Sequence, residues 1–135
     1  MPTDDDTKGF KNYWYEEGFK NAINYKINEE ITIKILSAPY FIATKLEAFK
    51  GRGNSDGRTS HDFEDIIFVL ENRKSIWDEL NHADHKLKEY LTLEFRTLFK
   101  NKNLFEWIDC HVESGSPPAS ILIMDEIQKL IAEIK

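Results

Sequence analysis

The spacing of apolar residues near the N-terminus predicts one short helix followed by two strands. Over residues 12–24 the apolar side chains recur every four positions and fall on one face of a helix. From residue 25 to residue 37 the period shortens to two, which is the repeat of half-buried strands. The helical face consists of Tyr15, Phe19 and Ile23, and the alternating positions are Tyr25, Ile27, Ile31, Ile33 and Ile35. We expect the chain to reverse at Asn28, Glu29 and Glu30 and so to form a small hairpin.

Beyond the hairpin the apolar residues return to a helical spacing. Gly51 is expected to end the first of these helices, and Thr59 or Ser60 to cap the second. Ser75 and Asp78 open a further short helix in the manner of a capping box. Helices are also predicted over residues 84–100, near 104–108 and over 119–134, with a turn at 114–118. The predicted fold class is therefore α+β and mostly α, a small hairpin followed by about five helices.

The length of 135 residues favours one domain, in which residues 1–37 form the N-terminal helix and hairpin and residues 38–135 form the helical part. A hydrophobic content of 41% with 13% aromatic residues is typical of a folded protein. The net charge of -6 argues against a general nucleic-acid-binding surface, although it leaves room for a small basic pocket.

Nothing in the sequence indicates secretion or membrane insertion. Cys110 is the only cysteine, so the chain has no internal disulfide. No apolar run approaches the ~20 residues that span a bilayer. The first residues are acidic and polar, unlike a signal peptide. We therefore expect a cytoplasmic protein with no membrane partner.

The densest group of charged residues surrounds a glycine-rich loop between two predicted helices, within residues 43–73. Lys45 and Arg52 flank the end of the first helix, and Asp62 and Asp65 project from nearly one face of the second. Cations in such a place suit a triphosphate, and the carboxylates suit a supporting or metal-binding role. The alternative is a structural cluster of ion pairs that pins the two helices together. The charged residues around this turn are Lys45, Lys50, Arg52, Asp56, Arg58, His61, Asp62, Glu64 and Asp65.

Histidines supply two weaker candidates for metal chemistry. The dipeptide His61-Asp62 suggests a helical metal phosphohydrolase, but no histidine precedes it to complete the ligand set. His82 and His85 have an i, i+3 spacing that a metal can use, and the competing interpretation is a surface or capping role.

Two further patterns have a chemical and a structural interpretation. Cys110 beside His111 suggests a nucleophile and its base, but neighbours on one backbone seldom meet in that way, which favours a half-buried structural cysteine. Tyr13, Trp14 and Tyr15 suggest a platform on which a base stacks, or else the packing of an N-terminal helix.

The segment from residue 37 to residue 73 resembles a known family. SAPYFIATKLEAFKGRGNSDGRTSHDFEDIIFVLENR is similar to the C-terminal half of bacterial nucleotidyltransferase-like proteins related to the AbiEii-type toxins of abortive-infection toxin–antitoxin systems. The opening MPTDDDTKGFKNYWYEEGFKNA resembles the segment just upstream in that group. The resemblance covers roughly residues 1–73, and the remainder corresponds only to a helical tail.

The resemblance implies phosphate contacts from Lys45 and Arg52 and a supporting role for Asp62 and Asp65, although Lys45 and Arg52 are spaced further apart here than in the family. In that family the acidic residues that hold divalent metals for nucleotidyl transfer lie in an N-terminal half. That half is not in this sequence, and Asp4, Asp5 and Asp6 do not replace it. Mg²⁺ and a nucleoside triphosphate are therefore expected only together with the missing half. Met1 is then either an internal methionine of a longer gene or the start of a remnant.

Two hypotheses follow for the function. In the first, the chain is the C-terminal part of a nucleotidyltransferase-like domain and is inactive alone. In the second, it is a helical protein-interaction module without catalysis, whose partner is a cognate antitoxin-like protein or its own copy. The second rests on the apolar strand at residues 31–36, which would be left uncovered and would invite pairing with another chain.

Overall fold

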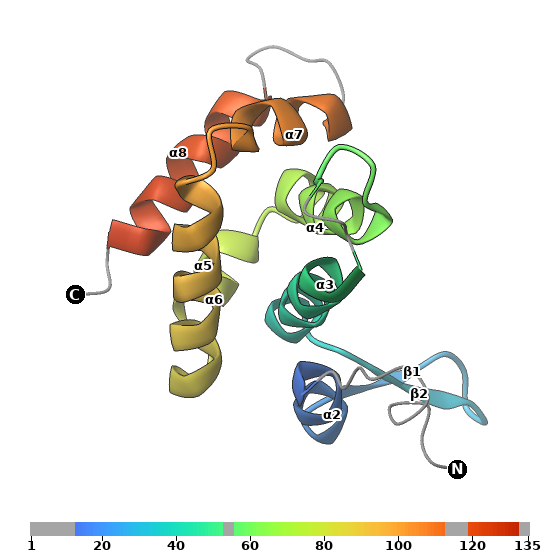
Figure 1. The fold of residues 1–135 in the computed structure, drawn as a ribbon. Coiled ribbons are helices and arrows are strands. Elements are labelled where there is room, and N and C mark those ends of the chain that lie inside the picture. Colours follow the sequence, from blue (N-terminus) through green and yellow to red (C-terminus); the bar gives the residue numbers. More distant parts are fainter. Residues whose placement is uncertain (1–12, 53–55, 113–118, 133–135) are drawn as a thin grey trace.

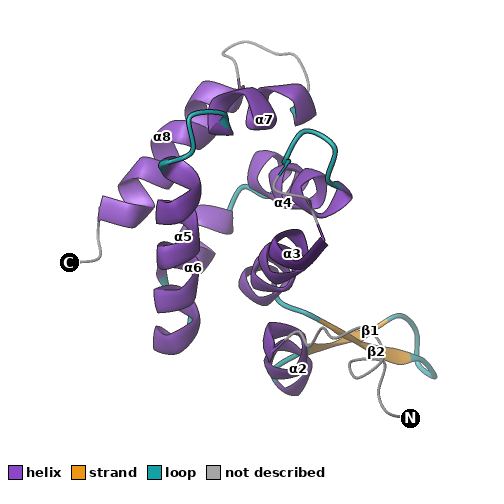
Figure 2. Ribbon diagram, viewed as in Figure 1, coloured by secondary structure: helices purple, strands orange, loops and turns teal. Residues whose placement is uncertain are grey.

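The structure, a computed structural model, describes residues 13–52, 56–112 and 119–132. Within these residues the chain forms helices and one antiparallel hairpin, an α+β fold that is mostly α, as the sequence indicated (Figures 1 and 2). Six helices follow the hairpin in this part of the chain, against the five or so expected. The elements are α2 (Tyr13–Lys20), β1 (Ile23–Lys26), β2 (Thr32–Ile35), α3 (Ala38–Arg52), α4 (His61–Asn72), α5 (Ile76–Asn81), α6 (His85–Phe99), α7 (Leu104–His111) and α8 (Ala119–Ala132).

The predicted hairpin and its turn are confirmed. Strands β1 and β2 pair in antiparallel register, with Ile23 opposite Ile35 and Tyr25 opposite Ile33. The side-chain Oδ1 of Asn28 accepts hydrogen bonds from the backbone N–H groups of Glu30 and Ile31, at 2.8 and 2.9 Å. An asparagine side chain that satisfies the turn in this way replaces the Asn-Gly pair of tighter hairpins.

Helix α2 is shorter than the predicted helix over residues 12–24 and turns a different face inward. The three residues expected to face the core are all exposed, and the last of them belongs to β1: Tyr15, Phe19 and Ile23. The buried residues of α2 are instead Trp14 and Gly18, which lie four apart on one side. Gly18 allows close packing, because a Cβ atom there would lie 2.6 Å from Leu36 Cδ2 and 2.9 Å from Tyr40 Cβ. The prediction was wrong because the neighbouring elements meet α2 on the side of Trp14, whose ring packs against Tyr40 and Tyr90, and of Gly18.

Helix α3 lies at the centre of the fold, where it contacts α2, α4, α5 and α6 (Figure 1). Its apolar stripe of Ile42, Leu46 and Phe49 is buried. The side chains that close over it from other helices include Phe63, Ile66, Ile67, Leu80, Leu87, Leu91 and Phe95. The helix runs through Arg52, one residue past the stop expected at Gly51.

One of the two predicted helix caps is present. The hydroxyl of Ser60 accepts a hydrogen bond from Phe63 N at 3.1 Å and so begins α4. Ser75 precedes α5 but makes no side-chain capping bond, so the capping box with Asp78 is not formed. The backbone of Ser75 (φ −88°, ψ 5°) lies outside the extended region that aims a capping hydroxyl at the first turn.

The C-terminal helices agree with the spacing of their apolar residues. Helix α6 packs on α3 and α8, and α7 packs on α4 and α8. The predicted turn at 114–118, the N-terminal residues 1–12 and Ile134 lie outside the described residues. None of the described helices combines the length and the apolarity needed to cross a bilayer.

We expect Gly57→Ala to lower the free energy of unfolding. Gly57 is buried against α7, and a Cβ atom there would lie 2.6 Å from ring carbons of Trp107. Overpacking of this kind costs about 1–3 kcal/mol, measurable by urea denaturation. Gly51→Ala is the matched control, since Gly51 is exposed in the last turn of α3 and alanine favours a helix. An equal loss in both variants would contradict the close contact with Trp107.

Candidate functional site

Lys45 of α3 and two aspartates of α4 form an ion-pair cluster where the two helices meet. Lys45 Nζ lies 2.8 Å from Asp65 Oδ2 and 3.5 Å from Asp62 Oδ1. Both aspartates face Lys45 because Ser60 begins α4 just before them and their three-residue spacing places them on one side of the helix. The same ammonium lies 5.5 Å from the ring centroid of Phe41. The structure therefore brings together three of the four residues that the sequence proposed.

The geometry of this cluster fits a structural ion pair better than a phosphate site. The side chain of Asp62 is 8% exposed, that of Lys45 23% and that of Asp65 47%. The ammonium already faces two carboxylates, so a phosphate group would have to displace one of them. Arg52, the second predicted phosphate contact, is the last residue of α3, and its side chain lies outside the described part of the chain.

The other charged residues near the loop do not converge on Lys45. Arg58 is paired with Glu106 of α7, and His61 Nδ1 lies 3.3 Å from Glu64 Oε1 on the surface of α4. Lys50 is directed toward α6. Charged residues that are close in the sequence thus form separate ion pairs. The contact of Lys50 with α6 was not expected from the sequence.

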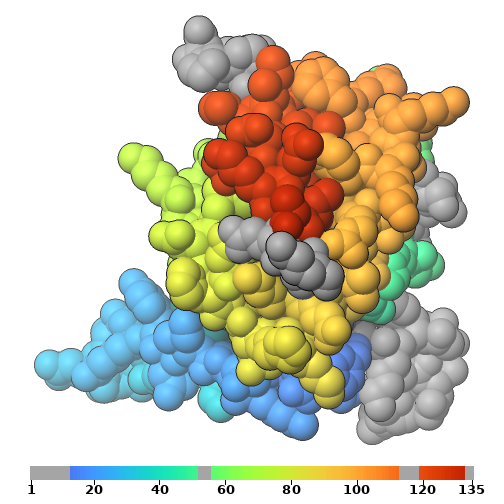
Figure 3. Space-filling model, turned by 90° about the vertical axis from the view of Figure 1, so that its left-hand side faces the viewer, coloured from blue at the N-terminus to red at the C-terminus, as the bar shows by residue number. Residues whose placement is uncertain are grey.

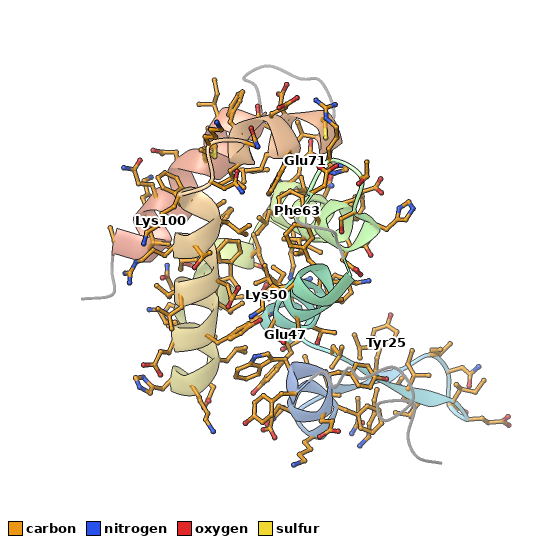
Figure 4. The ribbon with its side chains drawn as sticks, in the orientation of Figure 1. Tyr25, Glu47, Lys50, Phe63, Glu71 and Lys100 are labelled. Atoms are coloured by element: carbon orange, nitrogen blue, oxygen red, sulfur yellow. The ribbon has the colours of Figure 1, made fainter. Side chains whose placement is uncertain are left out.

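A second polar cluster, which sequence reasoning missed, joins α3 to α6. Lys50 Nζ lies 3.0 Å from Glu47 Oε2 and 3.0 Å from Glu94 Oε2. The hydroxyl of Tyr90 donates a hydrogen bond to Glu47, and Lys50 Nζ lies 5.4 Å from the Tyr90 ring centroid. Figure 4 shows Glu47 and Lys50 close together on α3. Glu47 and Lys50 are an i, i+3 pair, but no local spacing could signal the link to α6, because Glu47 and Tyr90 are 43 residues apart in the chain.

This second cluster holds its protons firmly. Burial raises the pKa of Tyr90, and the hydrogen bond to Glu47 raises it further. Desolvation acts to lower the pKa of Lys50, but hydrogen bonds to Glu94 and Glu47 outweigh it, and the pKa is raised. A tyrosine and a lysine that stay protonated at neutral pH are poor general bases. The cluster therefore suits a clamp between α3 and α6.

The histidine candidates have structural surroundings. His82 follows α5, and its Nδ1 lies 2.9 Å from the carbonyl oxygen of Asp78, in agreement with a capping role. His85 is exposed at the start of α6. Within residues 13–52, 56–112 and 119–132 no group of three or more histidine, cysteine, aspartate or glutamate side chains is arranged to hold a metal ion.

Cys110 is exposed, which corrects the expectation of a half-buried residue. Its thiol lies 3.2 Å from the carbonyl oxygen of Trp107, while His111 Nε2 lies 2.7 Å from the carbonyl oxygen of Gly57. Desolvation raises the pKa of the Cys110 thiol, nearby Glu106 raises it further, and Arg58 only partly opposes them. The two neighbours therefore do not form a thiolate–base pair.

Of the three aromatic residues at the start of α2, Trp14 packs in the hydrophobic core. Its ring centroid lies 5.0 Å from that of Tyr90 and 6.3 Å from that of Tyr40. Because Trp14 is buried between these rings, it cannot offer a face to a nucleobase. Tyr13 and Tyr15 are exposed on either side of it.

The hairpin presents a row of exposed apolar side chains. Ile23 and Tyr25 on β1 stand opposite Ile35 and Ile33 on β2, so all four share one face of the sheet. Figure 3 shows the hairpin, in blue and cyan, projecting beside the helical body. We call the following set the hairpin surface: Ile23, Tyr25, Ile27, Ile31, Ile33 and Ile35, each 41–57% exposed, with Phe68 of α4 at 65%. The expectation that the apolar strand at residues 31–36 would be left uncovered is confirmed for its three isoleucines.

A groove of about 540 Å³ separates the hairpin from the helices. Ile23 and Ile35 line it on the hairpin side, and Phe41 of α3 and Phe68 of α4 line it on the helical side. The apolar face of the hairpin is thus turned toward the side of α3 and α4, while Lys34 on the other face lies over the Phe19 ring of α2. Figure 4 shows Tyr25 on the hairpin, on the side of the sheet where α3 and α4 lie.

Comparisons of this chain with protein-family models, with curated proteins and with solved structures gave no match.

We expect Lys45→Ala to destabilise the protein more than Asp65→Ala. Removal of Lys45 takes the cation from Asp62, which is nearly buried, and such a loss costs about 1–3 kcal/mol. Asp65 is half exposed, and surface pairs of this kind contribute less than about 1 kcal/mol. Urea denaturation of both variants measures the difference.

A double variant provides the control. Adding Asp62→Asn to Lys45→Ala removes the carboxylate charge as well, so the two changes together should cost less than the sum of the single changes. Unchanged stability in Lys45→Ala would show that the cluster does not hold α3 to α4.

Proposed function

We propose that this chain works by binding another polypeptide through the hairpin surface, as a protein-interaction module. The observation that carries the proposal is the unpartnered apolar face of β1 and β2. Apolar patches larger than a few hundred Å² are uncommon on monomers and typically mark binding sites. The groove beside Phe41 and Phe68 adds a concave wall to this surface.

The construction of the hairpin supports the same proposal. Each strand has four residues, and all eight are exposed. A two-stranded hairpin of this size is marginally stable in water unless further strands or a packed helix cover it. Its two outer edges also carry backbone N–H and C=O groups that can bond to an added strand. A bound polypeptide would supply both the apolar cover and the missing hydrogen bonds.

Photo-cross-linking in cells that produce the chain tests this proposal. With p-benzoylphenylalanine in place of Tyr25, irradiation is expected to give a covalent adduct of defined mass. Ile33→Lys in the same chain should lower the adduct yield about tenfold, since ~1.4 kcal/mol of lost affinity is sufficient for that change.

The control places the same photoreactive residue at Phe105, which is 43% exposed on α7, far from the hairpin in the chain. Equal yields at positions 25 and 105, or a yield at position 25 that Ile33→Lys leaves unchanged, would contradict binding through the hairpin surface. Circular dichroism of Ile33→Lys checks that the helices remain folded.

A second candidate function comes from the resemblance of residues 37–73 to AbiEii-type nucleotidyltransferase-like proteins. In this proposal the chain is the C-terminal part of such a domain and transfers no nucleotide without a catalytic half that supplies the metal-binding carboxylates. This proposal is supported by the ion pairs of Lys45 with Asp62 and Asp65, because all three residues belong to the segment that resembles the family. The cluster would then position α3 and α4 beneath the catalytic half, and Mg²⁺ and a nucleoside triphosphate would bind only with that half.

We expect the purified 135-residue chain to show no transfer of a nucleoside monophosphate from labelled nucleoside triphosphates in the presence of Mg²⁺ or Mn²⁺. Metal-dependent transfer that survives Lys45→Ala would contradict both the inactivity and the role of the cluster. The in-frame DNA upstream of Met1 gives an independent check. An open frame that encodes a Gly-Ser turn and an Asp-x-Asp pair would support a truncated enzyme, and a stop codon there would oppose it.

A further inference from the structure

We infer that the polypeptide bound by the hairpin is a second copy of this chain, joined through the outer edge of β2 to form a four-stranded antiparallel sheet. This inference rests on the proposed interaction function and identifies its partner. Among the described residues, β2 has β1 on one side and no strand on the other. A two-fold dimer requires that the same strand meet itself in antiparallel direction, which is the direction that sheet edges accept most readily.

The backbone determines which residues of β2 can bond outward. Ile27 N donates to Ile31 O at 2.8 Å, so the odd-numbered residues of the second strand point their backbone groups toward β1. Because these groups alternate along a strand, those of Thr32 and Lys34 face the open edge. In a dimer, Thr32 would exchange hydrogen bonds with the partner's Lys34. Ile33 would then stand opposite the partner's Ile33.

The side chains select the same register. With Ile33 at the centre, Ile31 faces the partner's Ile35, and the isoleucines of both β2 segments fall on one side of the joined sheet. A shift by one residue would place isoleucine against polar neighbours. Two symmetric registers flank this one. The register centred on Lys34 would set Lys34 directly against the partner's Lys34, which like charges oppose. The register centred on Thr32 would leave Ile35 opposite the partner's Glu29, so fewer isoleucines would pair with each other.

The charges on the polar side are compatible with this pairing. In the register centred on Ile33, Glu30 lies diagonal to the partner's Lys34, and the two-fold axis repeats this contact. Diagonal neighbours are about 7–8 Å apart, within reach of these long side chains. The edge of β1 is less suitable, since a register centred on Tyr25 would bring Lys26 diagonal to the partner's Lys26. Centring on Asn24 would leave Ile27 opposite the partner's Asn21.

The dimer would also protect the apolar face. The two-fold axis of an antiparallel strand pair runs perpendicular to the sheet, so α3 and α4 of both copies lie on the same side of the joined sheet. That is the side toward which Ile23 and Ile35 point, because both line the groove with Phe41 and Phe68. The isoleucines of the two β2 strands would therefore lie between the α3–α4 pairs of the two copies, flanked by Phe68 from each. Four strands with one apolar face also meet the usual requirement for a stable sheet.

Disulfide trapping of the purified chain tests the register. In a Cys110→Ser background, Ile33→Cys should form a disulfide-linked dimer under mild oxidation, because a non-hydrogen-bonded pair places Cα atoms about 4.5 Å apart, within disulfide range. Ile35→Cys is the matched control, since both residues are 41% exposed on β2. Two Ile35 residues would be roughly 13 Å apart, so cross-linking should be at least about tenfold slower.

A charge exchange provides a second measurement that leaves the apolar face intact. By sedimentation equilibrium, Glu30→Lys and Lys34→Glu should each weaken the dimer, and the double variant E30K/K34E should restore it. Equal cross-linking at positions 33 and 35, a monomer at every concentration, or a double variant no better than the single ones would each overturn the homodimer. If Tyr25 still yields adducts that Ile33→Lys abolishes, the interaction function stands with a different partner. If those adducts are absent too, both proposals fail.

Discussion

Helix α3 is enclosed by its neighbours, and its burial determines where the charged residues of this protein can go. Ile42, Ala43 and Leu46 are almost completely inaccessible, with α2, α4, α5 and α6 packed around them. A helix in this position has little free surface, so the ammonium groups of Lys45 and Lys50 are held at its margins. Each is paired there with carboxylates, and the pairing matters most for Lys45, which is the more buried of the two.

These two lysines attach α3 to different parts of the fold. Lys45 contacts Asp62 and Asp65 of α4, and Lys50 contacts Glu94 of α6 as well as Glu47. The cluster on the α4 side arises from residues that are near one another in the sequence, whereas the cluster on the α6 side needs folding to bring Glu94 and Tyr90 to Lys50 and Glu47. In both clusters the lysine is paired with carboxylates of the protein. The charged residues around the loop therefore connect helices to one another.

The hairpin contrasts with this closed helical body. Its strands are exposed on both faces, and its apolar residues meet the helices only across a groove. The two proposed functions share this feature, since a catalytic half or a second chain would each be expected to cover the same surface. The difference between them lies in what covers the hairpin, and the spacing of Glu30, Ile33 and Lys34 along one strand favours another copy of that strand.

The sequence was sufficient for the element types and for local contacts. The two-residue period of Ile31, Ile33 and Ile35 predicted a strand, and Ser60 predicted the start of α4, because periodicity and capping act within one or two turns. It was insufficient wherever a distant element chose the outcome. Trp14 is buried in α2, whereas Tyr15, Phe19 and Ile23 are exposed. Glu47 accepts a hydrogen bond from Tyr90 of α6. Both outcomes depend on which surfaces meet after folding. The ion pairs of Lys45 were foreseen as one of two interpretations, and only the packing of α3 on α4 brought its carboxylates within bonding distance.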